Sequence, residues 1–184
     1  MLLKGCLHTH TTCSDGKMTP QEVADAYTGL GYDFIAFTDH DYLMKPAHDE
    51  LYDAVKTDLM IFKGVELTVF ERGYVHIGKI HGDEEQLHIL FHLGEYDLAF
   101  DQVMERMAAL AERYPLDAVE ITTKGFRDAE FDVDEIGCPR VATDDSHTLV
   151  GCGRAWIEMD CKRNRDSIIR AIRKGRFWNC YAKG

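Results

Sequence analysis

Short apolar segments that alternate with helical patterns are the feature that most restricts the fold of this chain. Apolar runs predict strands at residues 2–8, 34–38, 60–65, 74–80, 87–91, 118–122, 140–143, 155–158 and 177–181. Apolar residues at helical spacing and helix-start residues predict helices at 20–29, 46–55, 100–113 and 166–174. Strands that alternate with helices favour parallel β/α units. A full eight-fold barrel usually needs about 250 residues, so 184 residues predict a smaller, distorted α/β barrel in a single domain.

Polar side chains follow most of the predicted strands at the point where each strand ends. They are His8 and His10 after the first strand, Asp39 and His40 after the second, Glu66 after the third, His76 within the fourth, His92 after the fifth, and Asp145 and His147 after residues 140–143. A period of two places His8 and His10 on one face of the strand. Because the carboxyl ends of barrel strands converge on one rim, these side chains are expected to meet there.

Imidazoles and carboxylates that crowd at one rim are costly unless cations neutralise them. A cluster of divalent metal ions is the simplest neutraliser. Histidine nitrogen combined with carboxylate oxygen suits Zn, Mn or Fe better than Ca or Mg. The sequence therefore predicts a metal centre at the carboxyl ends of the strands.

Four motifs, in chain order, resemble those of the PHP (polymerase and histidinol phosphatase) domain of metal-dependent phosphoesterases. The motifs are His8-Thr9-His10-Thr11-Thr12-Cys13-Ser14-Asp15-Gly16, Ala36-Phe37-Thr38-Asp39-His40-Asp41, Gly64-Val65-Glu66-Leu67-Thr68 and Thr143-Asp144-Asp145-Ser146-His147. The resemblance covers nearly the whole chain and predicts a single domain over residues 1–184. It implies a distorted seven-stranded β/α barrel with two or three divalent metal ions at its rim.

The resemblance also implies a set of ligands. One metal would be bound by His8, His10, Glu66 and Asp145, a second by Glu66, His76 and His92, and a third by Asp15, His40 and His147. His81 and His88 are alternatives to His76, which fits best because it follows Glu66 by ten residues. Asp145 is preferred to Asp144 because it has the D-x-H spacing to His147. The fifth-strand motif reads Phe91-His92-Leu93-Gly94, where the family usually has His-Pro.

Hydrolysis of a phosphoester is the activity that the resemblance implies. A metal-bridging hydroxide held by His8, His10, Glu66 and Asp145 would attack phosphorus in line. Cys13 is not expected to be a nucleophile, because every base near it is already a predicted ligand. Candidate cations for the phosphate, each of which could instead be a solvated surface charge, are Lys124, Arg127 and Arg154.

The charge balance restricts the partners. With 21 Lys+Arg against 32 Asp+Glu, the net charge is −11, which argues against binding of duplex nucleic acid. A small phosphorylated substrate or a short oligonucleotide remains compatible, because bound metals would supply positive charge. The basic segment 162–176 is interpreted as a solvated amphipathic helix, and a docking strip for an oligonucleotide or an acidic partner is the alternative.

The absence of a long apolar run argues against a membrane span. Six cysteines without a C-x-x-C pair, and a start without the apolar stretch of a secretory signal, favour a cytoplasmic protein.

Three other functions use the same residues. The first is a phosphatase specific for histidinol phosphate, and the second is a non-catalytic, regulatory metal-binding module. All nine ligand positions can be filled, which favours an enzyme over a degenerate module. The third is a zinc-dependent amidohydrolase acting on C–N bonds, which would require a lysine between its metals that the sequence does not place.

Overall fold

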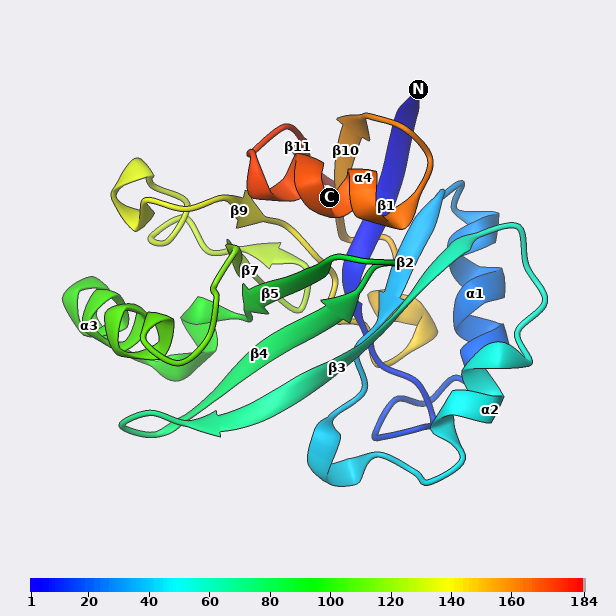
Figure 1. Ribbon diagram of the computed structural model, residues 1–184, viewed down its shortest axis with the longest axis horizontal. Helices are drawn as coiled ribbons and strands as arrows, with labels where there is room; N and C mark the ends of the chain where they lie inside the picture. The colour runs from blue at the N-terminus through cyan, green and yellow to red at the C-terminus, as the bar shows by residue number, and fades with distance from the viewer. Residues whose placement is uncertain (184) are drawn as a thin grey trace.

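The computed structural model describes residues 1–183, and its main feature is a nine-stranded sheet curled into a nearly closed barrel (Figure 1). The order of the strands is β11-β10-β1-β2-β3-β4-β5-β6-β9. Their bounds are β1 Leu2–Thr9, β2 Phe34–Phe37, β3 Met60–Phe70, β4 Tyr74–His81, β5 Gln86–Leu90, β6 Ala118–Glu120, β9 Arg140–Val141, β10 Ala155–Asp160 and β11 Trp178–Tyr181. A separate hairpin joins β7 (Thr122–Thr123) to β8 (Phe126–Arg127). The predicted α/β barrel is therefore confirmed.

Strand direction is mixed, which corrects the expectation of uniformly parallel units. β1, β2 and β3 are parallel, as are β5, β6 and β9. β4 is antiparallel to both of its neighbours, and β10 is antiparallel to β1 and β11. The connections 71–73 and 82–85 are too short for a crossover helix, so the strands that they join must form hairpins.

The barrel is closed at two places, one between its edge strands and one at its rim. The Asn179 side chain donates to the carbonyl of Arg140 and accepts from the amide of Ala142, both at 2.9 Å, and so links β11 to β9. At the rim, the amide of His10 donates to the carbonyl of Ser146 at 2.9 Å. The segment that follows β9 is thus fastened beside the end of β1.

Four helices lie outside or across the sheet: α1 (Pro20–Gly29), α2 (His48–Asp53), α3 (Phe100–Ala111) and α4 (Arg165–Arg173). α1 begins at the predicted capping box, where the Thr19 amide donates to the Glu22 carboxylate at 2.8 Å. α2 is shorter than the predicted 46–55. The amide of His48 donates to the carbonyl of Lys45 at 3.1 Å, so that residues 46 and 47 form a turn before the helix.

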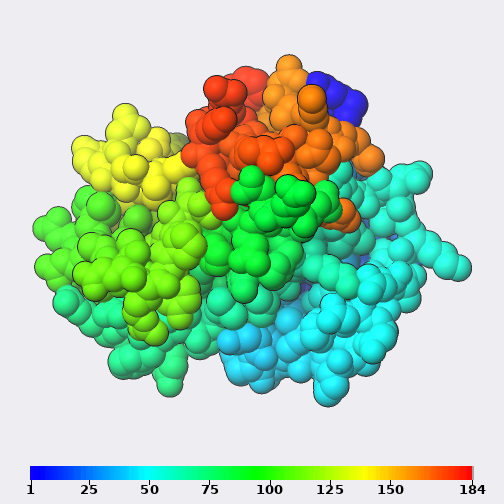
Figure 2. Space-filling model, viewed as in Figure 1, coloured from blue at the N-terminus to red at the C-terminus, as the bar shows by residue number. Residues whose placement is uncertain are grey.

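α4 covers the end of the barrel opposite the rim. Ile168, Ile169 and Ile172 are fully buried in the main core, as the helical spacing predicts. The Asp166 carboxylate accepts hydrogen bonds from the backbone amides of residues 83–85, in the turn between β4 and β5. Figure 2 shows this contact as the orange-red α4 segment lying directly on the green turn.

The basic segment 162–176 is partly neutralised by ion pairs. Arg165 pairs with Asp83 at 3.0 Å, and Arg173 pairs with Asp117 at 2.9 Å. Arg170 pairs with Glu85 at 3.2 Å. The alternative of a docking strip for an oligonucleotide stays a prediction, with three of its arginines already engaged. Within residues 1–183, none of the helices is long and apolar enough to cross a membrane.

Candidate metal centre

A β-bulge in β1 turns the first histidines toward the inside of the barrel. Between Cys6 and Thr9, three steps along β1 face only two steps along β2. The extra residue lets consecutive side chains face inward. Leu7 lies in the core, and His8 stacks on Phe91 with ring centroids 3.6 Å apart. The two-residue period then brings the His10 side chain inside as well.

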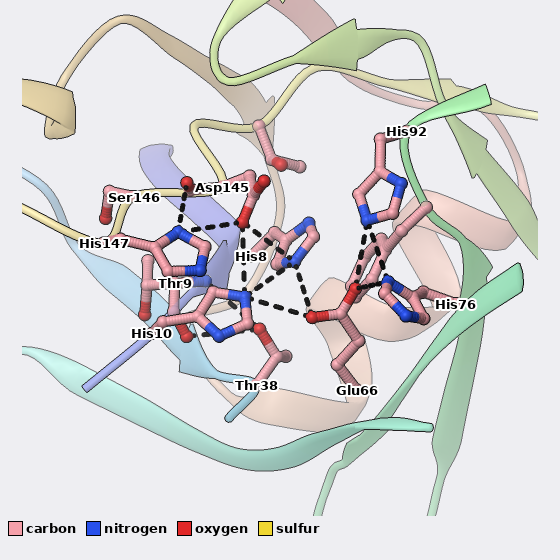
Figure 3. Close-up of polar contacts among 12 residues, drawn as sticks. His8, Thr9, His10, Thr38, Glu66, His76, His92, Asp145, Ser146 and His147 are labelled. Atoms are coloured by element: carbon pink, nitrogen blue, oxygen red, sulfur yellow. Dashed lines mark hydrogen bonds and ion pairs between the residues drawn. The ribbon is translucent and has the colours of Figure 1, made fainter. Parts of the chain in front are cut away.

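Glu66 lies at the centre of the site, fully buried between two groups of imidazoles (Figure 3). β3 continues past the predicted end at residue 65, so Glu66 sits within the strand rather than after it. Its two oxygens face five histidines. Oε2 lies 3.1 Å from His10 Nε2, 3.1 Å from His40 Nδ1 and 3.5 Å from His8 Nε2, whereas Oε1 lies 2.9 Å from His76 Nδ1 and 3.0 Å from His92 Nε2.

Asp145 provides a second buried carboxylate. Its Oδ1 lies 3.4 Å from His8 Nε2, 3.2 Å from His10 Nε2 and 3.4 Å from His147 Nδ1. The residue has a φ of +46°, which is unusual for a residue other than glycine. His92, at +32°, shares this left-handed backbone. Strained backbone of this kind concentrates at functional sites.

Asp15 forms the half-exposed side of the site. Its Oδ1 lies 3.4 Å from His10 Nδ1, and its Oδ2 lies 3.3 Å from His147 Nε2 and 3.8 Å from His40 Nε2. The loop that follows β1 therefore contacts both the buried and the solvent-exposed part of the cluster.

The carboxylates and imidazoles shift one another's pKa values. Burial lowers the pKa of His8, but Asp145, Glu120 and Glu66 together raise it to about 10. Burial raises the pKa of Glu66, but His8, His10 and His76 bring it well below its usual range. Burial lowers the pKa of His40, which keeps its imidazole neutral. Without metal, protons on buried imidazoles balance the buried carboxylates.

Several buried atoms in the cluster lack a hydrogen-bond partner, which tests whether metals fit. They include Glu66 Oε2, Asp145 Oδ1, His10 Nδ1, His40 Nδ1 and His92 Nδ1. Buried polar atoms without partners are rare unless a ligand or ion engages them. The donor set, imidazole nitrogen with carboxylate oxygen, is the one that Zn, Mn and Fe accept. The residues therefore fit divalent metal ions.

Four groups of side chains hold their ligand atoms within 4.8 Å of one another. The groups are His10, Asp15, His40 and His147; His8, His10 and Glu66; His8, His92 and Asp145; and His40, Glu66 and His76. Every predicted ligand belongs to at least one group. The division differs from the predicted one, because His10 also joins the Asp15 group and His40 joins Glu66 and His76. Which ligand binds which metal stays a prediction.

Three residues that the sequence left as alternatives lie apart from these groups. His81 and His88 lie toward the end of the β4–β5 pair that is away from the rim, near residues 86 and 117. His76 reaches the rim because β4 runs antiparallel and begins there. Asp144 faces away and accepts hydrogen bonds from the Tyr27 hydroxyl at 2.8 Å and from the backbone of residues 153 and 155.

Glu120 is a site residue that the sequence analysis missed. It is fully buried at the end of β6, and its Oε2 lies 3.2 Å from His8 Nδ1 and accepts from the His92 amide at 2.8 Å. Its Oε1 accepts from the hydroxyls of Thr122 and Thr143. A carboxylate inside the apolar run 118–121 was the signal that could have revealed it.

The three candidate cations lie at different depths. Lys124 Nζ forms an ion pair with Asp145 Oδ2, at the edge of the cluster. Arg154 donates to the carbonyl of Lys124 at 3.2 Å, one step farther out. Arg127 pairs with Asp132 at 2.6 Å and makes no contact with a predicted ligand within the described residues. Lys124 is therefore the nearest of the three to the site.

Comparisons with known proteins agree with this geometry. The family profile described as the PHP domain matches residues 7–133. The "DNA polymerase/3'-5' exonuclease PolX" of Bacillus subtilis is 32% identical over 84 residues, 39% of this chain and 15% of that protein. The "5'-3' exoribonuclease Rnm" of Escherichia coli is 36% identical over 74 residues, 39% of this chain and 25% of that protein. The chain thus matches only a small part of either relative.

Solved structures share the fold at low sequence identity. A two-domain protein from Bacteroides vulgatus, described as containing a predicted PHP-like metal-dependent phosphoesterase, has a TM-score of 0.76 at 17% identity over 98% of this chain and 65% of its own. An amidohydrolase from Chromobacterium violaceum has a TM-score of 0.68 at 16% identity over 95% of this chain and 97% of its own. These similarities concern the barrel itself.

Proposed function

Because the chain belongs to the PHP domain family, we propose that it is a metal-dependent phosphoesterase acting on a phosphomonoester or a short nucleotide. The observation that carries this proposal is the position of Glu66. Its Oε1 faces His76 and His92, and its Oε2 faces His8 and His10. A carboxylate between two imidazole groups is suited to bridge two metal ions.

The residues of the cluster have different proposed roles. Divalent metal ions bound at the cluster would activate a water molecule and neutralise charge on the phosphoryl oxygens. His8, His10 and Asp145 present buried ligand atoms on one side of Glu66, and His76 and His92 present theirs on the other. Asp15 and His147, the more exposed ligands, form the side from which a substrate enters, with the buried His40 next to them.

Lys124 is the proposed phosphate-binding cation. It is half-exposed and already reaches a carboxylate of the cluster. Burial lowers its pKa, but Asp145 raises it above the usual value, so the ammonium stays charged. With a metal ion bound at Asp145, the Lys124 ammonium would be free to contact a phosphoryl oxygen. Cys13 is a poor alternative nucleophile, since burial raises the pKa of its thiol.

The competing functions receive less support. The Glu66 carboxylate occupies the place between the imidazole groups, so an amidohydrolase centre bridged by lysine is not favoured. Two relatives are named as nucleases, which supports a nucleotide over histidinol phosphate. A non-catalytic module would not require a complete ligand set open to solvent at Asp15 and His147.

Metal analysis combined with phosphatase assays tests the proposal. The purified protein, loaded with Zn, Mn or Fe, is assayed on p-nitrophenyl phosphate, nucleotides and histidinol phosphate. We expect metal-dependent cleavage that His76→Ala abolishes and His81→Ala on the same strand leaves intact. Lack of bound or activating metal would contradict the proposal. Bound metal without cleavage of any phosphoester would favour the non-catalytic module.

A further inference from the structure

Glu66 lies on one face of the β3–β4 ribbon, and this face extends outward beyond the metal cluster. Thr68 pairs with His76, and Phe70 pairs with Tyr74, in the antiparallel register. Alternate residues of a strand share a face. Glu66, Thr68 and Phe70 therefore lie on the same face as His76 and Tyr74, which runs from the predicted ligands to exposed aromatic rings.

A pocket opens on this face next to His76. Its volume is about 470 Å³, and it is lined by Tyr42, Thr68, Tyr74 and His76. Tyr42 is 63% exposed and Tyr74 71% exposed. The Tyr42 ring lies 5.3 Å from the ring of His40, which ties the pocket to the cluster on its second side. Thr68 Oγ1 is buried without a hydrogen-bond partner.

We propose that Tyr42 and Tyr74 form a stacking subsite for the nucleobase of a nucleotide whose phosphate lies at the cluster. This inference rests on the proposed phosphoesterase function. Two residues along a strand span about 7 Å, so Tyr74 lies beyond His76 by a distance that a ribose can bridge. Thr68 Oγ1 is available for a ribose hydroxyl or a base edge. Aromatic side chains stack on every base, so this subsite selects for a base rather than for its identity.

The composition of the pocket separates this substrate from the alternatives. An aliphatic phosphomonoester would leave both tyrosine rings exposed to water. None of the four lining residues carries a carboxylate to pair with the ammonium group of histidinol phosphate, and the neighbouring Asp41 carboxylate already accepts a hydrogen bond from the Thr68 amide at 3.2 Å. A planar, uncharged base attached to a phosphorylated sugar would cover the tyrosine rings and would need no acidic partner.

Steady-state kinetics on two substrates that share a phosphorylated ribose test the subsite. Adenosine 5′-monophosphate carries a base and ribose 5-phosphate does not. We expect Tyr42→Ala and Tyr74→Ala to lower kcat/KM for the nucleotide roughly five- to a hundredfold, mainly through KM, and to leave ribose 5-phosphate unchanged. Tyr74→Phe should restore the nucleotide value, and Trp178→Ala, an exposed aromatic on β11, should change neither. Parallel loss for both substrates, or no loss for either, would overturn the inference.

Binding measurements separate this inference from the proposed function. If the metal-loaded protein hydrolyses neither of these compounds nor any other phosphoester, the phosphoesterase proposal fails, and calorimetric titration then tests the subsite alone. Tighter binding of adenosine 5′-monophosphate than of ribose 5-phosphate, lost in Tyr74→Ala, would support the stacking subsite. Equal affinities for the two compounds would refute it.

Discussion

Glu120 Oε2 lies 3.2 Å from Nδ1 of His8, and this contact leaves Nε2 of His8 facing Asp145 Oδ1 at 3.4 Å. A carboxylate at Nδ1 fixes the tautomer and the ring orientation of a histidine whose other nitrogen binds metal. We therefore expect Glu120 to act by positioning His8.

Glu120→Gln should weaken metal binding. The two carboxylate oxygens of Glu120 take part in four hydrogen bonds, so the NH2 group of a glutamine side chain would face hydrogen-bond donors. Affinity should fall about ten- to a hundredfold, measured by titration with Zn or Mn. Glu112→Gln, at an exposed position, is the matched control. Unchanged metal affinity in Glu120→Gln would show that its role is only structural.

The meeting of the predicted ligands could be foreseen from the sequence, because it follows from strand-end positions. Asp145 and His147 come directly after one apolar run, and His8 and His10 come at the end of another. Parallel strands bring such ends to one rim whatever the exact bounds of each strand. The predicted ligands on the parallel strands therefore converge in the structure.

Other parts of the site depend on tertiary structure. The bulge that puts both Leu7 and His8 inside the barrel has no local sequence pattern. His76 reaches the rim only because β4 is antiparallel, which depends on hairpins rather than crossover helices. Glu120 resembles an ordinary strand residue until His8 is placed beside it.

Substitutions of the neighbouring Asp144 and Asp145 should affect different properties, the first the free energy of unfolding and the second metal binding. Asp145→Asn is expected to lower metal content, because Asp145 faces three imidazoles. Asp144→Asn should leave metal content intact and lower the free energy of unfolding by about 1–3 kcal/mol, since three donors share its carboxylate. Metal analysis and chemical denaturation with a chelator present measure the two effects. The reverse pattern would mean that Asp144 is the ligand.

Acidification should weaken metal binding. Burial lowers the pKa of His8, but Asp145, Glu120 and Glu66 together raise it to about 10, so His8 carries a proton at neutral pH. Metal binding must release this proton, and affinity should therefore increase with pH up to about 10. Titration calorimetry in two buffers of different ionisation enthalpy measures the proton release. Identical heats in both buffers would contradict the prediction.

The same shift affects the stability of the metal-free protein. The folded-state pKa of His8, about 10, lies above its value in the unfolded chain. Its contribution to the free energy of unfolding is therefore complete below pH about 6.5 and is lost as the pH rises through about 10.

Lys124→Ala should raise KM for phosphoesters more than either arginine substitution. A lost charge-assisted contact costs about 1.5–3 kcal/mol, which corresponds to roughly ten- to a hundredfold. Arg154→Ala should have a smaller effect, because Arg154 contacts only the Lys124 carbonyl. Arg127→Ala should have the least, because its partner is Asp132. Steady-state kinetics on one substrate rank the three variants, and a larger effect for Arg127 would place the phosphate elsewhere.

The bridging role of Glu66 is tested most directly by metal content per chain. Mass spectrometry of the metal-loaded protein should find two or three divalent ions in the unmodified chain. Glu66→Gln should lose at least the pair that its carboxylate would share, while circular dichroism shows that the fold is retained. The same metal content in both proteins would contradict the account.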